Sequence, residues 1–149
     1  WLAGSNGVIE KRMMDARYTV ASRTSAFSPA PDSACFDGLY FWTANSRAGT
    51  IVKRMPGDAL GEIRTFKYPG QKLAALTCDT RFLWVADQGL RSLVKLALDD
   101  PERIISKTEL DVYASRTLKI TALAAKDGII WFAGEDGDKG LAFYKDEPK

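Results

Sequence analysis

Two side chains with metal-ligating oxygens, Asn45 and Asp87, occupy matching positions of a short motif that the chain repeats. Each follows a Trp-x-Ala tripeptide, so a fold that superposes the repeats brings both toward one end of the molecule. Several convergent carboxylates and amides can hold a hard divalent cation. The other two copies have glycine there, at Gly4 and Gly134. We therefore favour the alternative that Asn45 and Asp87 close the turns that follow them. We expect no cofactor, and a divalent cation is the open alternative.

Two further acidic groups have competing interpretations. Glu135, Asp136 and Asp138 share one loop and could hold calcium, but their spacing does not match an EF-hand loop, so we favour a solvated loop. Three more aspartates are expected to be turn residues: Asp37, Asp79 and Asp127. Glycine follows the first and the third, and Asp-Gly suits the type I′ hairpin turn, which needs positive φ at both central residues.

Lys11, Lys53 and Lys95 recur at one position of successive repeats. A basic stripe of this kind, with aromatic residues, could bind single-stranded RNA. We favour solvated lysines whose stems cover apolar surface, and nucleic acid is not an expected partner.

The two cysteines, Cys35 and Cys78, lie 43 residues apart. They could form a disulfide if their Cα atoms lie within about 7 Å, but we favour buried free thiols.

A repeat of 41, 42 and 47 residues positions these groups. Its motif residues are Trp1, Ala3, Trp42, Ala44, Trp84, Ala86, Trp131 and Ala133. Tryptophan and alanine two positions apart share one face of a strand. We expect the indoles to fill the space between neighbouring sheets and the alanines to let those sheets approach.

Short β-rich runs bounded by Gly, Asp and Asn turns, four to a unit, predict four-stranded antiparallel propeller blades. The expected blades are a partial blade at 1–28, full blades at 33–70 and 73–113, and a partial blade at 119–145. The predicted fold class is therefore an all-β, incomplete β-propeller. Such an arc leaves sheet faces and edges open, so we expect it to be ordered beside complementary blades. Closure into a four-bladed ring is the alternative.

The string Leu83-Trp84-Val85-Ala86-Asp87-Gln88-Gly89 resembles the NHL repeat, and Gly38-Leu39-Tyr40-Phe41-Trp42-Thr43-Ala44-Asn45 resembles a looser relative shared with the YWTD repeat. The resemblance covers about three and a half repeats. It implies half of a six- or seven-bladed ring, a fold that serves receptors, scaffolds, RNA-binding proteins, lactonases and lyases. Related lactonases hold a metal near the end of the ring where Asn45 and Asp87 are expected.

The composition of the chain excludes some classes of functional site. The chain has 149 residues, 21 basic and 19 acidic side chains and no histidine. A histidine-containing triad or zinc site is therefore excluded within it. No apolar run approaches the ~20 residues of a membrane span, and we expect a soluble protein, with an extracytoplasmic location left open. The first residue lies inside a repeat, so we expect a processed or incomplete piece.

The leading hypothesis is a non-catalytic module that mediates protein–protein interaction within a larger chain or assembly. Its expected partner is another protein or the remaining blades of a parent chain. The alternative is a metal-dependent lactonase- or lyase-like enzyme whose site is completed by missing blades. We lean against an enzyme, because the sequence shows a strong repeat but no nucleophile motif and no phosphate-binding glycine loop.

Overall fold

The computed structural model describes residues 2–3, 7–24, 27, 29–110, 118–137 and 140–146. Within these residues the chain forms fourteen β-strands in four antiparallel sheets, which we number blade 1 to blade 4 in chain order. No helix that could span a membrane occurs in the described segments.

Each blade is a meander in which consecutive strands pair. Blade 1 contains β1 (Leu2–Ala3), β2 (Ile9–Arg12) and β3 (Val20–Thr24). Blade 2 contains β4 (Ser33–Phe36), β5 (Phe41–Asn45), β6 (Thr50–Arg54) and β7 (Glu62–Lys67). Blade 3 contains β8 (Leu73–Cys78), β9 (Phe82–Asp87), β10 (Ser92–Ala97) and β11 (Ile104–Glu109). Blade 4 contains β12 (Lys119–Lys126), β13 (Ile129–Asp136) and β14 (Gly140–Asp146).

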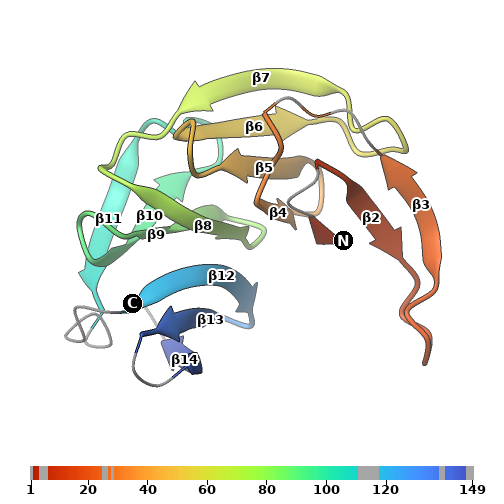
Figure 1. The fold of residues 1–149 in the computed structure, drawn as a ribbon. Helices are drawn as coiled ribbons and strands as arrows, with labels where there is room; N and C mark the ends of the chain where they lie inside the picture. Colours follow the sequence, from red (N-terminus) through yellow and green to blue (C-terminus); the bar gives the residue numbers. More distant parts are fainter. Residues whose placement is uncertain are drawn as a thin grey trace.

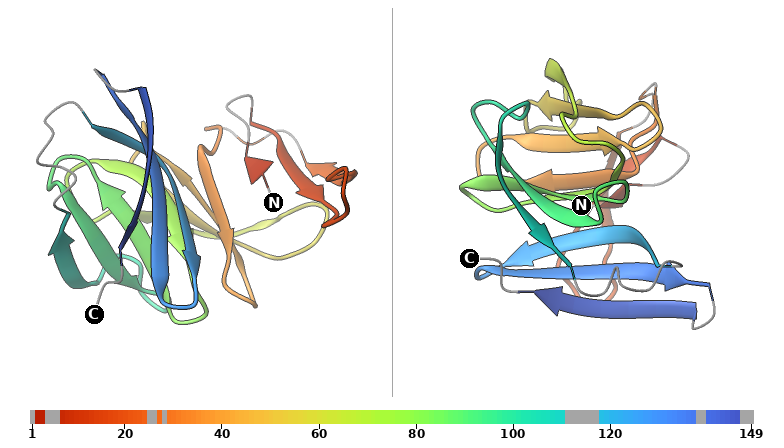
Figure 2. Two further views of the ribbon diagram at one scale, coloured as in Figure 1. Left: turned by 90° about the horizontal axis from the view of Figure 1, so that it is seen from below. Right: turned by 90° about the vertical axis from the view of Figure 1, so that its left-hand side faces the viewer.

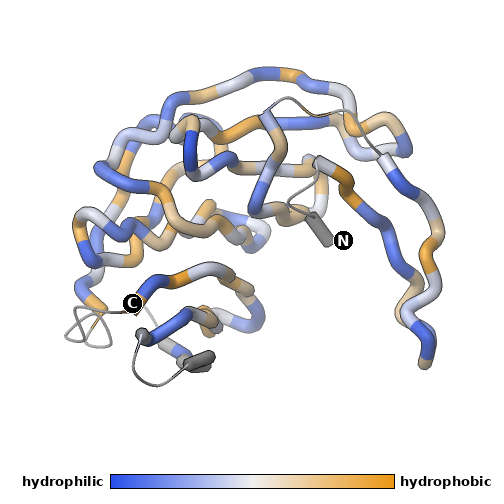
Figure 3. Tube along the Cα trace, in the orientation of Figure 1, coloured by the Kyte–Doolittle hydropathy of each residue, from blue (hydrophilic) through white to orange (hydrophobic). Residues whose placement is uncertain are grey.

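The four sheets fan out in an arc, with β4, β8 and β12 innermost (Figure 1). Blades 1 and 4 are the two ends of the arc, and Figure 2 shows each sheet turned relative to its neighbour. The prediction of an all-β, incomplete propeller is confirmed by this arrangement. Figure 3 shows hydrophobic residues along the inner strands β8 and β12, whereas the outer strand β7 is mainly hydrophilic. The core therefore lies between the blades.

Three clusters of buried side chains join successive blades. In each cluster, one blade contributes the face that looks toward the next blade in chain order, which we call its forward face. The next blade contributes its opposite, backward face. Between blades 2 and 3, Trp42 and Ile51 meet Leu83 and Val85. Between blades 3 and 4, Trp84 and Leu93 meet Ile130 and Phe132. Between blades 1 and 2, Ile9 meets Phe41 and Leu60.

Two hairpin aspartates hold the tryptophans of blades 2 and 3. The Asp37 carboxylate accepts hydrogen bonds from the backbone N–H groups of Leu39 and Tyr40, at 2.7 and 2.6 Å, and from Trp42 Nε1 at 2.7 Å. Asp79 binds Trp84 Nε1 in the same way at 3.0 Å. The type I′ prediction fits Asp127, where φ is 52°, followed by Gly128 at 79°. It is wrong for Asp37, whose φ is not positive and whose side chain closes a different turn.

The two cysteines form a disulfide between β4 and β8, with a Cα–Cα distance of 5.8 Å. The prediction of free thiols is therefore wrong. The Trp42–Trp84 spacing is 42 residues, but the cysteine spacing is 43. Because side chains alternate along a strand, the extra residue turns Cys78 to its backward face, whereas Cys35, paired with Trp42, points forward. The two sulfur atoms meet between the blades and link them covalently.

The tryptophans do not share one environment. Trp42 and Trp84 are 0% and 5% exposed and lie between blades, but Trp131 is 48% exposed. This differs from the expectation that every indole fills an inter-blade space. The physical reason is that Trp131 lies on the forward face of blade 4, on which no described sheet packs. Trp1 lies outside the described residues.

Candidate functional site

Asp87, at the end of β9, anchors the connection between blades 2 and 3. It is fully buried, and its Oδ1 accepts hydrogen bonds from the backbone N–H groups of Lys72, Gly89 and Leu90 at 3.0, 2.8 and 2.9 Å. Its Oδ2 accepts bonds from Tyr68 Oη and the Gln71 N–H, both at 2.8 Å. The carboxylate therefore closes the turn after β9 and also fixes the segment that leads into β8.

The electrostatics of Asp87 follow from these contacts. Burial alone would raise the pKa of the Asp87 carboxyl, because it disfavours the charged form. The hydrogen bonds from Leu90, Gln71 and Tyr68 favour the carboxylate and lower the pKa below its usual value. Gly70 permits this arrangement, since a Cβ at that position would lie 2.3 Å from Asp87 Oδ2. Asp87 is thus a buried, ionised structural group.

Asn45 occupies the same repeat position in blade 2, with different partners. Its Oδ1 accepts a hydrogen bond from the Ala48 N–H at 2.6 Å, so it closes the turn after β5. Its Nδ2 donates to the Ala30 carbonyl oxygen at 2.5 Å. An amide fits here because the segment before β4 presents a carbonyl, whereas the segment before β8 presents N–H groups to Asp87.

The corresponding position in blade 4 cannot take a side chain. A Cβ at Gly134 would lie 2.6 Å from the Lys119 carbonyl oxygen and 3.0 Å from Leu118 Cδ1. The fourth position, Gly4, lies outside the described residues. Across the described part of the chain, no three His, Cys, Asp or Glu side chains lie close enough together to hold a metal ion.

The prediction of a solvated acidic loop is wrong for Glu135 and Asp136, which are the last two residues of β13. Glu135 is exposed, whereas Asp136 is buried, with an exposed fraction of 3%. Their side chains point to opposite faces of the strand because they are adjacent in it. Asp138 lies outside the described residues.

Two of the three recurring lysines lie over aromatic rings. Lys53 Nζ is 3.6 Å from the centroid of the Tyr40 ring. Lys95 Nζ is 4.3 Å from the Phe82 centroid and 4.8 Å from the Trp84 centroid. Both lysines are half-buried. Their aliphatic stems and ammonium groups therefore cover the aromatic rings that they contact. Lys11 is exposed.

A cleft of about 1170 Å³ opens where blades 2, 3 and 4 converge. The turn between β5 and β6, the segment between β7 and β8, and the first residues of β12 form its walls. Its charged side chains are Asp32, Arg47, Lys67, Lys72, Lys119 and Glu135. Four cations therefore face two carboxylates, an excess of two positive charges in a cleft that three blades build.

The four cations of the cleft are available to a ligand. All four side chains are exposed, and none lies within ion-pair distance of a carboxylate in the described part of the chain. Asp32, by contrast, is partly engaged, since it accepts a hydrogen bond from the Ser46 N–H at 2.9 Å. One further polar atom, Gln88 Oε1, is buried without a hydrogen-bond partner among the described residues. The cleft thus offers positive charge to a ligand.

Sequence reasoning did not select these cations. The signal that could have found two of them is a repeat: Lys72 and Lys119 each stand directly before an aliphatic residue, Leu73 or Ile120, at the start of an innermost strand. The register confirms the equivalence, because Leu73 pairs with Asp87 and Ile120 pairs with Gly134. Arg47 and Lys67 have no such pattern, and the approach of separate blades brings them to the cleft.

Solved structures similar to this chain are β-propeller proteins. Glutaminyl cyclase from Myxococcus xanthus matches with a TM-score of 0.55 and 17% identity, over 72% of this chain and 48% of that chain. Virginiamycin B lyase from Staphylococcus aureus matches with a TM-score of 0.53 and 12% identity, over 91% and 48%. The WD40 repeats of RRP9 match with a TM-score of 0.57 and 13% identity, over 95% and 46%.

These likenesses show the propeller fold, and this chain spans about half the length of each of those chains. They include enzymes as well as WD40 repeats, so they do not choose between catalysis and interaction. No protein-family model matches the chain, and no curated protein matches it. The narrower NHL and YWTD resemblance therefore stays a prediction.

Proposed function

We propose that this chain is a non-catalytic β-propeller module that binds an acidic segment of another protein in the cleft of blades 2, 3 and 4, within a larger chain or assembly. The observation that carries the proposal is the set of four exposed cations without ion-pair partners, Arg47, Lys67, Lys72 and Lys119, around one cleft. Complementary charge across an interface steers a partner and sets its specificity.

The composition of the cleft favours a peptide over a nucleic acid. Proteins that bind single strands offer exposed aromatic faces on which bases stack. The aromatic residue among the described lining residues is Tyr68, and its side chain is buried with its hydroxyl bonded to Asp87. Charge and amide groups without a stacking surface suit aspartate and glutamate side chains.

The metal-dependent alternative has less support in the geometry. It would use Asn45 and Asp87, but the Asp87 oxygens accept five hydrogen bonds between them. A cation would have to displace donors that fix the connection between blades 2 and 3. We therefore assign these two side chains to the structure of the module.

The experiment measures binding of a fluorescein-labelled polyglutamate peptide by anisotropy, with labelled oligothymidylate as the competing class. The double variant Lys72→Glu/Lys119→Glu should weaken polyglutamate binding at least about tenfold, since each reversal removes an attraction and adds a repulsion. The control, Lys107→Glu/Lys126→Glu, makes the same change in net charge at exposed positions outside the cleft. Equal losses in both variants, or tighter binding of oligothymidylate than of polyglutamate, would refute the proposal.

A further inference from the structure

The outer hairpins of blades 1, 2 and 3 have turns at matching positions. We call these segments, 13–19, 55–61 and 97–103, the outer turns; they lead from β2 to β3, from β6 to β7 and from β10 to β11. In each outer turn the N–H of the first residue donates to the carbonyl oxygen of the last: Met13 to Thr19 at 2.8 Å, Met55 to Gly61 at 2.8 Å, and Ala97 to Arg103 at 3.3 Å. The outer turns therefore lie at the same end of their blades.

The outer turn of blade 1 exposes two adjacent methionines. Met13 and Met14 are 55% and 92% exposed. Met55, which matches Met13, is 54% exposed although Leu60 of the same turn is buried against blade 1. Exposure at this position is therefore a property of the turn and does not depend on whether a neighbouring blade is present. Tyr18 is different, because it matches Leu60, with φ of 49° and 46°, and so lies at a position that packs between blades.

Polar groups of the turn itself hold its shape. Asp15 Oδ1 accepts hydrogen bonds from the backbone N–H groups of Arg17 and Thr19, at 3.2 and 2.9 Å. The hydrogen bonds from Thr19 lower the pKa of the Asp15 carboxyl, so it is ionised at neutral pH. The exposed side chains of Met13 and Met14 are therefore not needed to close the turn.

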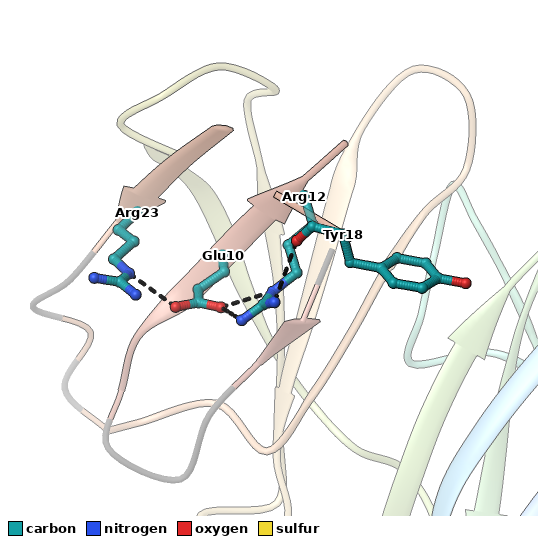
Figure 4. A network of polar contacts seen from close by, with 4 residues as sticks. All are labelled: Glu10, Arg12, Tyr18 and Arg23. Carbon is teal, nitrogen blue, oxygen red and sulfur yellow. Dashed lines mark hydrogen bonds and ion pairs between the residues drawn. The ribbon is translucent and has the colours of Figure 1, made fainter. Parts of the chain in front are cut away.

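An ion-pair network fixes the base of the hairpin. The Glu10 carboxylate accepts hydrogen bonds from Arg12 Nε at 2.9 Å and from Arg23 Nε at 2.8 Å (Figure 4). Arg12 also donates to the Tyr18 carbonyl oxygen at 3.2 Å, which ties β2 to the end of the turn. The hairpin of β2 and β3 projects from the end of the arc, with its turn away from the other three blades (Figure 1). Met13 and Met14 thus stand on a supported projection.

The hairpin also carries positive charge. Residues 10–23 contain two carboxylates and four cations: Lys11, Arg12, Arg17 and Arg23. Their net charge of +2 equals that of the whole chain. The outer turn of blade 3, by contrast, has three carboxylates and one arginine, and that of blade 2 has one carboxylate and no cation. An anionic surface therefore attracts the hairpin of blade 1 and repels the outer turn of blade 3.

We infer that the outer turn of blade 1 docks on an anionic lipid surface, with Met13 and Met14 inserted at the boundary between headgroups and acyl chains and Arg17 among the headgroups. Apolar side chains beside cations bind such surfaces through apolar burial and attraction to anionic lipids. A stable protein interface buries about 800 Å² on each side, far more than two methionines on a projecting turn offer. A lipid surface needs no matching pocket, because its chains rearrange around an inserted side chain.

This docking leaves the cleft accessible. The turn between β5 and β6 forms one wall of the cleft, and β6 runs from that turn to the outer turn of blade 2. The outer turns and the cleft are therefore at opposite ends of the strands. The inference goes beyond the proposed binding of an acidic segment and does not depend on it.

The test is co-sedimentation of the full chain with vesicles of equal parts phosphatidylcholine and phosphatidylserine, compared with vesicles of phosphatidylcholine alone. Met13→Ser/Met14→Ser should lower the partition coefficient on the mixed vesicles at least about tenfold, because it removes the inserted apolar groups. Arg17→Gln should lower it about fivefold on the mixed vesicles and leave binding to phosphatidylcholine unchanged.

The matched control is Ile63→Ser/Ile105→Ser. It removes two apolar side chains that are 45% and 44% exposed on the outer strands β7 and β11, and it should leave vesicle binding unchanged. Urea unfolding checks that each variant is folded. If the double methionine variant is destabilised, Met14→Ser alone replaces it and should still weaken binding to the mixed vesicles.

Several results would overturn the inference. The unmodified chain could fail to bind the mixed vesicles, or it could bind both kinds of vesicle equally. The methionine and isoleucine variants could lose binding to the same extent, which would indicate general adhesion of exposed apolar groups. Loss of vesicle binding in Lys72→Glu/Lys119→Glu, with the methionine variant unaffected, would place the lipid contact at the cleft.

Discussion

Replacing Asp87 by asparagine tests whether the buried carboxylate holds blades 2 and 3 together. The substitution keeps the size of the side chain but turns one acceptor oxygen into a donor. If the new amide nitrogen replaces Oδ2, it faces the Gln71 N–H, whereas the Tyr68 hydroxyl can rotate and accept a bond. The Oδ1 atom keeps its three backbone partners but loses the strength that the negative charge adds.

The magnitude follows from these contacts. A backbone N–H left without a partner costs about 1–3 kcal/mol. Each of three hydrogen bonds that changes from charged to neutral loses about 1 kcal/mol. Since the donors share one carboxylate, these losses do not add fully. We expect Asp87→Asn to lower the free energy of unfolding by roughly 3 kcal/mol at pH 7.

Urea unfolding followed by tryptophan fluorescence measures this loss. The pKa of Asp87 is lowered in the folded state, so its stabilisation is complete above the unfolded pKa of about 3.9 and is lost as the pH falls through the folded pKa. The difference between wild type and variant should therefore shrink in acid. Asp58→Asn, at an exposed carboxylate, is the matched control and should change little. A difference below about 0.5 kcal/mol at pH 7, or one that persists unchanged in acid, would refute this reasoning.

Three further changes test other contacts by the same unfolding assay. The double variant Cys35→Ser/Cys78→Ser should lower the free energy of unfolding by about 4 kcal/mol, the chain-entropy value for a 43-residue separation. Reductant should have no effect on the stability of this variant. Equal stability with and without the disulfide would contradict the prediction. Trp84→Phe should lower the free energy of unfolding by about 1–3 kcal/mol, because it removes the Nε1 donor to the Asp79 carboxylate. Trp131→Phe, at an exposed position, should change it by no more than about 0.5 kcal/mol. Similar losses in both variants would show that exposure does not distinguish the two tryptophans. Asn45→Asp should cost about 1–3 kcal/mol, since it sets a carboxylate against the Ala30 carbonyl oxygen, and a stabilised variant would show that another donor is present there.

The repeat was enough to predict the fold, because the hairpin turns and the regular spacing of the tryptophans can both be read directly from the sequence. Asp37 and Asp79 bind the indole five residues later, so the sequence encodes the tryptophan position and its hydrogen-bond acceptor together. Blade 4 lacks this pair. The residue five positions before Trp131 is Lys126, and among the three described tryptophans Trp131 is the exposed one. That substitution was a readable sign that the fourth copy differs.

The site was harder to predict, because it depends on which side chains different blades bring to one place. The disulfide required reading the cysteine spacing against the tryptophan spacing, where one residue decides the direction of Cys78. The cleft required knowing that Arg47, in a turn of blade 2, lies near Lys119 at the start of blade 4. Such proximity comes from the packing of sheets and has no signal in the local pattern.

The residue that follows Trp-x-Ala differs between blades because its contacts differ. Asn45 donates to a carbonyl, Asp87 accepts N–H groups, and Gly134 leaves room for the Lys119 backbone. In these three blades the residue matches the segment that enters the innermost strand, so the segment between blades selects the side chain. A shared metal site would instead require the same ligand chemistry in several blades. The variation at this position therefore favours a structural role for Asn45 and Asp87 and directs the search for binding residues to the cations of the cleft.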